Sequence, residues 1–281
     1  MGGRACENSR LTSVMIPVGI TIIGNWAFSG CRGLASVIIP ETVTCIGDSA
    51  FRGCTGLVSV IILEGIINLG NNVFVGRKSL ASVTIPEGVS RIGDYAFFNC
   101  SGLVSAAIPT SVTSIGKQAF ADCTGLAAIT IPEGVTVIGK DAFDNYEILA
   151  SVTIREGVAD IGRTAFSGCK SLASVTIPPG VTSIGAQAFW ECFRLKSITI
   201  PGNVITIDNW TFAGCSNLVS VTILEGVTTI GVEAFVSCRS LTFLILPDSV
   251  TRIGSGAFKG CYNLKPEVRA DIEKRFGNGV F

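Results

Sequence analysis

The sequence contains no histidine, which removes the most versatile catalytic side chain. Without histidine there is no Ser-His-Asp triad, no Cys-His dyad, no histidine metal ligand and no common general base near neutral pH. Charged residues make up only 15% of the chain, and its 21 basic and 21 acidic side chains cancel. A neutral chain with a pI near 6.3 lacks the positive field that nonspecific nucleic-acid binding requires. We therefore expect a non-enzymatic protein that does not bind nucleic acid.

Long apolar runs are also missing, although the mean hydropathy is high at +0.55. Gly, Pro, Glu, Asp or Arg interrupts every apolar run well before the roughly 18 residues that a membrane-spanning helix needs. The N-terminal residues have no basic start followed by an apolar block, which is the pattern of a secretion signal. We expect a chain that is not transmembrane and whose apolar residues form a core along its whole length.

A repeat of 23 residues, without insertion or deletion, runs through nearly all of the 281 residues. It places leucine at Leu11, Leu34, Leu57, Leu80, Leu103, Leu126, Leu149, Leu172, Leu195, Leu218, Leu241 and Leu264. Apolar residues that return at such a period are typical of a solenoid, in which each coil buries its inner face against its neighbours. We expect an N-terminal segment at 1–10, eleven coils in one domain at 11–263, and a C-terminal cap at 264–281.

The first half of each coil has the pattern of a short strand, as in LASVTIPEGVSRIGDYAFFNC at residues 80–100. Leu80, Val83 and Ile85 are spaced to point inward, and the polar residues between them point outward. Pro86 follows at a place that proline occupies in eight coils, and a residue without an amide hydrogen ends a ladder of hydrogen bonds. This segment is predicted to join a parallel sheet.

The second half of the coil begins with a shorter extended segment in which Val89 and Ile92 point inward. Gly93 follows, and because ten coils have glycine there we expect a left-handed backbone corner. Phe97 and Cys100 then lie three residues apart, as on one face of a short helical turn. Phenylalanine fills this place in all eleven coils, so we expect a stack of rings along the axis.

The consensus LxSVTIPEGVTxIGxxAFxxC resembles the BspA-type (Treponema-pallidum-type) class of leucine-rich repeats, and the likeness covers Leu11 to about Leu264. The resemblance implies a curved leucine-rich-repeat solenoid with its parallel β-sheet on the concave side. It also implies a role in adhesion and protein recognition, often at the surfaces of bacterial and protist cells. Because one fold supports many functions, the resemblance does not identify a ligand.

Nine of the eleven cysteines occupy one inward position of the coil. Strands about 4.8 Å apart hold equivalent Cβ atoms farther apart than the roughly 3.8 Å of a disulfide, so we expect reduced, buried thiols. The sequence has no CxxC pair for zinc, and nothing in it indicates a cofactor. Free thiols without a secretion signal favour a cytoplasmic location, whereas the family resemblance allows the cell surface. Arg77 and Tyr146 replace cysteine in two coils, and we expect both side chains to swing outward or find partners.

Two surfaces are candidates for binding a protein partner. Met15, Ile38 and Ile61 share an outward strand position where later coils mostly have threonine, and Val58 adds to them. An apolar patch of this kind indicates a contact surface. Alternatively, these residues serve strand propensity, or residues 1–10 fold over them.

Large aromatic residues form the second candidate, in the eighth and ninth coils. Trp190, Phe193 and Trp210 replace mostly small or polar residues, and Arg194 lies beside them. Tryptophan is enriched at binding hot spots. Alternatively, these rings fill a wedge between curved coils.

Acidic residues recur where the strands end, with Glu41, Glu64 and Glu87 in three successive coils and Glu133 and Glu156 in two more. A solvated rim is the simpler interpretation, and a site for calcium or for a basic partner is the alternative. An enzyme acting through this rim is the least favoured hypothesis.

The two ends of the repeat differ. Residues 266–276 begin with Pro266, carry apolar residues at four-residue spacing and stop before Gly277, which predicts a capping helix. The first coil is preceded by only about ten polar residues, which leaves an edge capable of self-association unless they cover it. The sequence thus favours a protein-protein interaction module, or alternatively a structural or adhesive cell-surface element that acts by self-association.

Overall fold

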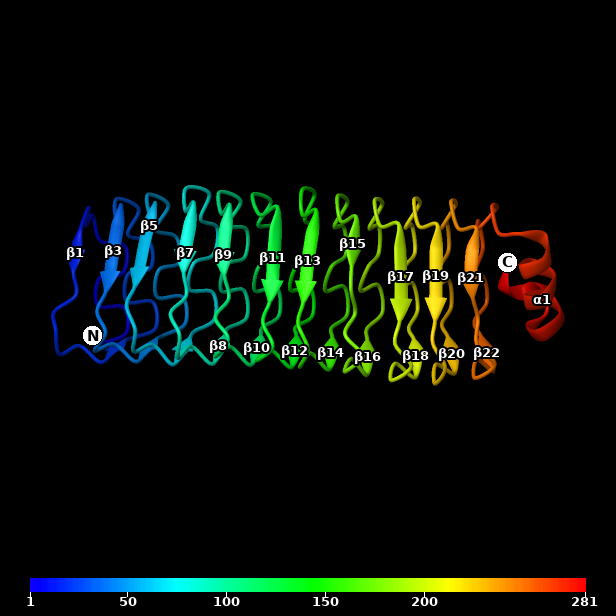
Figure 1. The fold of residues 1–281 in the computed structure, drawn as a ribbon. Coiled ribbons are helices and arrows are strands. Elements are labelled where there is room, and N and C mark those ends of the chain that lie inside the picture. Colours follow the sequence, from blue (N-terminus) through cyan, green and yellow to red (C-terminus); the bar gives the residue numbers. More distant parts are fainter. The chain divides into compact units, whose positions relative to one another are not determined.

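The computed structural model describes residues 1–281, which form two compact units, Met1–Val135 and Thr136–Phe281. Each unit is a parallel β-solenoid in which a coil of 23 residues contributes two strands (Figure 1). The first has two to four residues and is called the longer strand, and the second has two residues and is called the shorter strand. This architecture confirms the predicted parallel leucine-rich-repeat solenoid. The concave position of the longer strands stays a prediction.

In unit 1 the longer strands follow one another in chain order from β1 to β9, and β11 lies next to β9. They are β1 (Val14–Met15), β3 (Ser36–Ile39), β5 (Ser59–Ile62), β7 (Ser82–Thr84), β9 (Ser105–Ala107) and β11 (Ala128–Ile131). The shorter strands form a second parallel sheet: β2 (Ile22–Ile23), β4 (Cys45–Ile46), β6 (Asn68–Leu69), β8 (Arg91–Ile92) and β10 (Ser114–Ile115). Each residue pairs with the one 23 positions later, as Val60 does with Val83. The constant repeat length therefore sets the register.

Unit 2 repeats this arrangement. Its longer strands are β13 (Ser151–Ile154), β15 (Ser174–Val175), β17 (Ser197–Ile200), β19 (Ser220–Ile223) and β21 (Phe243–Ile245). Its shorter strands are β12 (Val137–Ile138), β14 (Asp160–Ile161), β16 (Ser183–Ile184), β18 (Thr206–Ile207), β20 (Thr229–Ile230) and β22 (Arg252–Ile253). Side chains alternate between core and solvent along the longer strands, because successive residues point to opposite faces.

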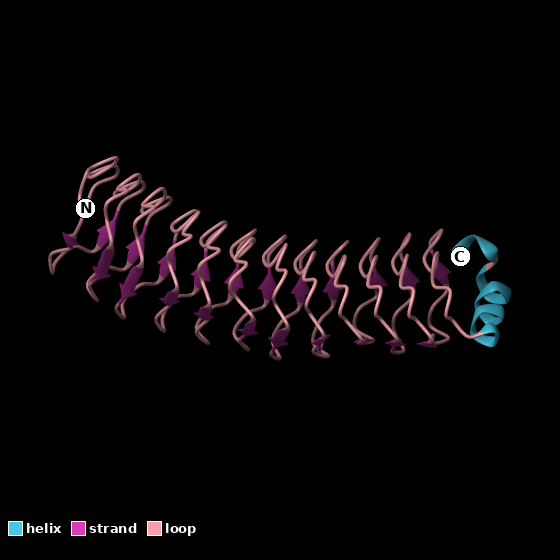
Figure 2. Cartoon of the chain, turned by 90° about the horizontal axis from the view of Figure 1, so that it is seen from above, coloured by secondary structure: helices cyan, strands magenta, loops and turns pink.

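The predicted helical turn is a run of β-turns that also hydrogen-bond to the next coil. In the coil that begins at Leu80, Ala96 N–H donates to the carbonyl of Gly93 at 3.3 Å, and Phe98 N–H donates to that of Tyr95 at 3.1 Å. The amides between them reach the following coil, as Phe97 N–H does to the carbonyl of Ala119 at 2.8 Å. The segment is therefore a ribbon paired along the axis, with turns and strands at matching places in successive coils (Figure 2).

The prediction of a left-handed corner at Gly93 is wrong. The positive φ falls two residues later, at Tyr95, where φ is 58°. Glycine is needed at position 93 for a different reason: a Cβ atom there would lie 2.6 Å from the backbone of Gly70 in the preceding coil. Close approach of stacked backbones, not an unusual dihedral angle, thus explains the recurring glycine.

The phenylalanine stack is present in both units. Ring centroids from Phe28 to Phe120 in unit 1 are 5.1–5.7 Å apart. Those from Phe143 to Phe258 in unit 2 are 5.3–5.5 Å apart. All these rings are buried and nearly parallel, within the range expected for offset stacking. The prediction of a ring column is confirmed within each unit.

Both ends of the chain stack on the neighbouring coil. The predicted capping helix is confirmed as α1 (Pro266–Phe276), with Ile272 buried, and a short 3₁₀ helix, η1 (Asn278–Val280), follows. The ring of Phe281 then lies 6.0 Å from that of Phe258 at a tilt of 37°, a contact that the repeat pattern does not predict. At the other end, Cys6 N–H donates to the carbonyl of Ala27 at 2.7 Å, so the N-terminal segment lies along the turns of the first coil.

Candidate functional site

The first candidate surface, called the apolar strip, lies on the outward face of the longer strands of unit 1. Met15 pairs with Ile38 and Ile38 pairs with Ile61, so the three side chains form one column. They are 89%, 55% and 47% exposed, and Val58 is exposed as well. The N-terminal segment does not cover them. The structure therefore brings Met15, Ile38 and Ile61 together on one open face, and Val58 lies just before β5.

A shallow recess of about 320 Å³ adjoins the apolar strip between β1 and β3. Met15, Val37, Ile38 and Pro40 belong to its lining. The recess is a depression in the surface of the sheet, and an apolar side chain of a partner can insert into it.

The second candidate surface is divided by the structure into two places. Trp190 and Trp210 lie in the turn ribbons and are 36% and 38% exposed, so most of each indole is covered. Trp210 Nε1 donates to Glu233 at 2.9 Å. Phe193 and Arg194 lie in the next turn, just before β17, with Phe193 half-buried and Arg194 exposed. Because most of each indole is buried, packing within the coils is part of the role of Trp190 and Trp210.

Arg194 belongs to a basic recess that the sequence analysis did not identify. This recess has a volume of about 470 Å³. It is lined by Ala173, Arg194, Lys196, Asn217, Val219 and Ser240. The signal in the sequence was the pair of cations around Leu195, where other coils have mostly small residues. Asn217 and Ser240 come from the two following coils, so their place beside that pair follows from the stacking of the turns.

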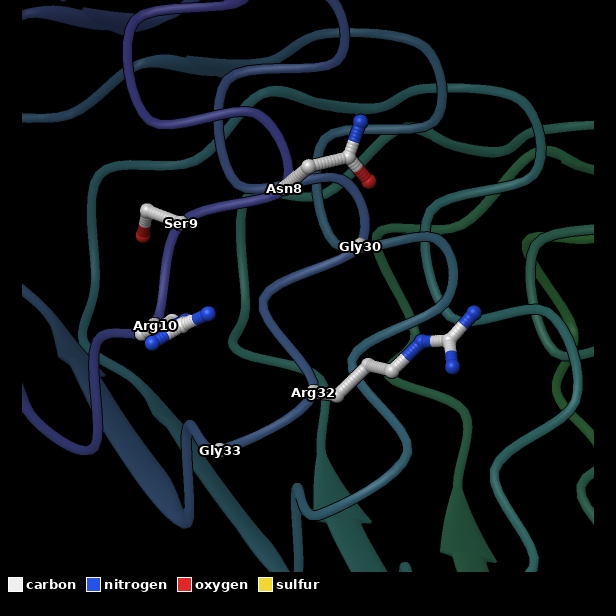
Figure 3. A pocket seen from close by; sticks show the side chains of 6 residues that line it. All are labelled: Asn8, Ser9, Arg10, Gly30, Arg32 and Gly33. Atoms are coloured by element: carbon white, nitrogen blue, oxygen red, sulfur yellow. The ribbon is translucent and has the colours of Figure 1, made fainter.

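A similar recess of about 420 Å³ lies at the start of unit 1 (Figure 3). Asn8 and Arg10 come from the N-terminal segment and Arg32 from the first coil, while Gly30 and Gly33 keep part of the lining free of side chains. The turns before the longer strands thus carry arginine in both units.

Arg77 was expected to swing outward or find partners; it does not swing outward, and only part of its guanidinium finds a partner. It is 1% exposed, and its Nη2 donates to the carbonyl of Phe51. Its Nε and Nη1 have no hydrogen-bond partner. Burial lowers the pKa of Arg77, whereas the neighbouring Cys54 and Cys100 act in the opposite direction. The tight stacking of the turn ribbon holds its Cβ inward, so the side chain follows the position that cysteine occupies in other coils.

Tyr146 is also buried, and of the two expected alternatives it meets the second, because it finds a partner inside the core. Its ring lies 6.2 Å from that of Phe143 at a tilt of 57°. The larger ring takes the place of the small thiol and extends the aromatic packing of unit 2.

The cysteines of the column are buried as predicted, and all eleven cysteines are free thiols. The column comprises Cys31, Cys54, Cys100, Cys123, Cys169, Cys192, Cys215, Cys238 and Cys261. A typical member, Cys54, donates from Sγ to the carbonyl of Phe28 at 3.0 Å. Burial raises the pKa of Cys54 to about 11 and that of Cys215 to about 12. These thiols are poor nucleophiles, since the thiolate is the reactive form.

The partly exposed thiols, Cys6 and Cys45, lie outside this column. No group of three or more His, Cys, Asp or Glu side chains is placed to hold a metal ion. None of the helices combines the length and apolar character needed to cross a lipid bilayer.

The acidic rim of unit 1 lies just beyond the ends of the longer strands. Glu41, Glu64 and Glu87 are exposed, as expected for a solvated rim. Glu87 Oε2 accepts hydrogen bonds from Thr110 Oγ1 at 3.5 Å and from Ser111 N–H at 3.4 Å. At least one of these carboxylates therefore ties one coil to the next.

Comparisons with known proteins agree with this architecture. A leucine-rich repeat protein from Bacteroides ovatus is 27% identical, with a TM-score of 0.68, and the match covers 100% of this chain and 86% of that one. One from Eubacterium ventriosum is 28% identical, with a TM-score of 0.57, over 90% of this chain and 83% of that one. The pneumococcal vaccine antigen PcpA, at 16% identity and a TM-score of 0.57 over 99% of this chain and 75% of that one, shares the fold.

Comparison with curated proteins gives no significant match. The profile of the BspA type leucine rich repeat region (6 copies) matches residues 1–126, 46–166 and 136–265. These ranges span both units and nearly all of the coils described above. The chain belongs to the BspA-type leucine-rich repeat family.

Proposed function

We propose that this chain is a non-enzymatic protein-binding module that presents the apolar strip of unit 1 to a protein partner. The observation that carries the proposal is the exposed, in-register column of Met15, Ile38 and Ile61. Later coils place mostly threonine at this position, so strand formation alone does not require aliphatic residues there. Contiguous exposed apolar side chains on a folded surface favour contact with another macromolecule.

The aromatic and basic residues of unit 2 provide a second contact region under this proposal. Arg194 is exposed, and each of the two indoles keeps more than a third of its surface open. Tryptophan and arginine are over-represented among residues that dominate binding energy. Family membership supports an interaction role, and it leaves the partner open.

The test is crosslinking capture of partners from the native lysate with the variant Ile38→Lys, Ile61→Lys. The matched control, Thr176→Lys, Thr199→Lys, adds the same charge at the same coil position in unit 2. We expect specific proteins to be captured by the wild type and the control and lost by the strip variant. Identical capture by all three chains would refute the role of the apolar strip. The variant Trp190→Ala, Trp210→Ala tests the aromatic residues in the same way.

The alternative function is a structural or adhesive element that acts by self-association, and the same exposed strip supports it. Light scattering on the wild type and on Ile38→Lys, Ile61→Lys separates the two functions. If the wild type forms an assembly that dissociates in the variant, the result supports self-association. If the wild type and the variant are both monomers, the result supports binding to a different protein.

We further propose that the chain works where its thiols stay reduced, because nine of them are buried core residues. Alkylation of protein isolated from its native source without reductant, followed by mass spectrometry, tests this. Recovery of disulfide-linked peptides would contradict the proposal.

A further inference from the structure

Charge is unevenly distributed in the turns that lead into the longer strands of unit 2. The segments 169–174, 192–197, 215–220 and 238–243 precede or begin β15, β17, β19 and β21. They contain four cations, Lys170, Arg194, Lys196 and Arg239, and no carboxylate, whereas the equivalent segment before β13, residues 146–151, contains one carboxylate, Glu147, and no cation. In a chain with a net charge of zero, this edge of the unit therefore has a local positive excess.

Three of these four cations lack an ion-pair partner. Lys170 Nζ lies 2.6 Å from Glu147 Oε1, which neutralises it. Arg194, Lys196 and Arg239 are exposed and form no salt bridge. Their positive charges are therefore available to a ligand.

The nearest carboxylate in sequence is turned toward a different part of the unit. The side chain of Glu191 lies against Gly214, where its Cγ would be 3.2 Å from an added Cβ. The hydrogen bond and the charge of Glu147 raise the pKa of Lys170, and the charge of Glu191 adds to this effect.

Arg194 and Lys196 both line the basic recess, and hydrogen bonds between coils hold the backbone around it. Asn217 Nδ2 donates to the carbonyl of Phe193 at 2.7 Å, and Val219 N–H donates to the carbonyl of Lys196 at 2.8 Å. The two cations are thus attached to a stacked, paired scaffold. Less conformational freedom is lost on binding when the backbone of a site is already ordered.

We propose that the basic recess binds a carboxylate-rich segment of a protein partner. A guanidinium matches the two oxygens of a carboxylate, and a nearby ammonium adds a second charge contact. Val219 and Ala173 line the same recess and suit the aliphatic stem of a glutamate side chain. The inference rests on the proposed function, because the acidic segment belongs to the protein partner.

A short acidic peptide fits this surface better than an extended polyanion. Glu225 and Asp248 follow β19 and β21, at the opposite ends of the strands that begin at the basic recess. A long polyanion crossing the unit would meet these carboxylates, whereas a short segment contacts the recess alone. Like charges in the path of a ligand oppose its binding.

The experiment measures fluorescence anisotropy of a labelled hexaglutamate peptide with the full chain at low and physiological salt. We expect saturable, salt-sensitive binding that becomes at least about tenfold weaker in Arg194→Glu, Lys196→Glu, since two attractive contacts become repulsive. The matched control is Arg252→Glu, Lys259→Glu, which makes the same change in net charge in unit 2 away from the recess. The control should lose less than about threefold, because distant exposed charges are screened.

Three results would overturn the inference. They are no binding of hexaglutamate at low salt, equal loss in the two charge-reversal variants, and tighter binding of a single-stranded hexanucleotide than of the peptide. The neutral variant Arg194→Gln, Lys196→Gln with an unchanged unfolding temperature separates a lost contact from a lost fold. Ile38→Lys, Ile61→Lys should still bind the peptide, so failure of the apolar strip is distinguishable from failure of the basic recess.

Discussion

Replacing the buried Arg77 with cysteine should stabilise the fold. Arg77 occupies the position that cysteine fills in nine other coils, and the guanidinium is almost fully enclosed with Nε and Nη1 unpaired. In Arg77→Cys the new thiol can donate to the carbonyl of Phe51, as Cys100 Sγ donates to that of Phe74 at 3.0 Å. The change therefore removes two unsatisfied donors and a buried charge while keeping one hydrogen bond of the coil.

The magnitude follows from two opposing terms. Each buried donor without a partner costs about 1–3 kcal/mol, so removing two contributes about 2–6 kcal/mol. The smaller side chain vacates a volume of about 65 Å³, which costs about 1.5 kcal/mol at ~24 cal/mol per Å³. The expected net stabilisation is about 0.5–4.5 kcal/mol, and its midpoint of about 2.5 kcal/mol corresponds to a rise in unfolding temperature of about 4 °C in a chain of this size.

The assay is thermal and urea unfolding under reducing conditions, followed by far-ultraviolet circular dichroism. Lys78→Cys is the matched control, because it introduces a thiol at the adjacent exposed residue and should leave the midpoint nearly unchanged. A midpoint that falls or stays the same in Arg77→Cys would refute the reasoning. It would show that the guanidinium is satisfied in solution.

Further predictions concern the thiols and the aromatic stack. Raising the pH above 9 should lower the unfolding temperature: burial raises the pKa of Cys54 from 9.0 to about 11 and that of Cys215 to about 12, so unfolded thiols ionise first. Each such thiol contributes a slope of about 1.4 kcal/mol per pH unit between its unfolded and folded pKa, and a flat profile from pH 8 to 10.5 would contradict this. A colorimetric thiol assay should detect only the two partly exposed thiols in the native protein and all eleven in denaturant, and fast reaction of more than two native thiols would show that the column is accessible. Phe189→Ala should destabilise unit 2 by about 3–5 kcal/mol, whereas the exposed Phe243→Ala should cost far less, and equal losses in urea unfolding would contradict a stacked core.

Most of the fold could be predicted because each coil repeats the same pattern of apolar, glycine and phenylalanine residues. The apolar positions of Leu80, Val83 and Ile85 indicated the strand, and the unbroken 23-residue period indicated the parallel register. The reason for Gly93 could not be read from the sequence, since positive φ and close backbone approach both favour glycine. The sequence also could not show that Phe281 returns to the ring column, because a single ring outside the repeat has no period.

The candidate surfaces were predictable to a smaller extent. The column of Met15, Ile38 and Ile61 follows from strand alternation and register, so the sequence sufficed to group them. The basic recess joins residues from separate coils, and their proximity depends on the turns between strands. For Arg77, the cost of burying a charge favours an outward side chain, but the side chain stays at the inward position that cysteine has in other coils.

Residues that match the repeat consensus form the core and the turns of the solenoid. Residues that differ from the consensus are therefore the candidates for a specific function. A departure that points inward, such as Arg77, changes stability, because it replaces a core side chain that every neighbouring coil packs against. A departure that points outward, such as Ile61 or Lys196, leaves the core unchanged and alters only what solvent or a partner meets. The two kinds are therefore separable by experiment: Arg77→Cys should change unfolding without changing peptide binding, and reversal of Arg194 and Lys196 should do the opposite.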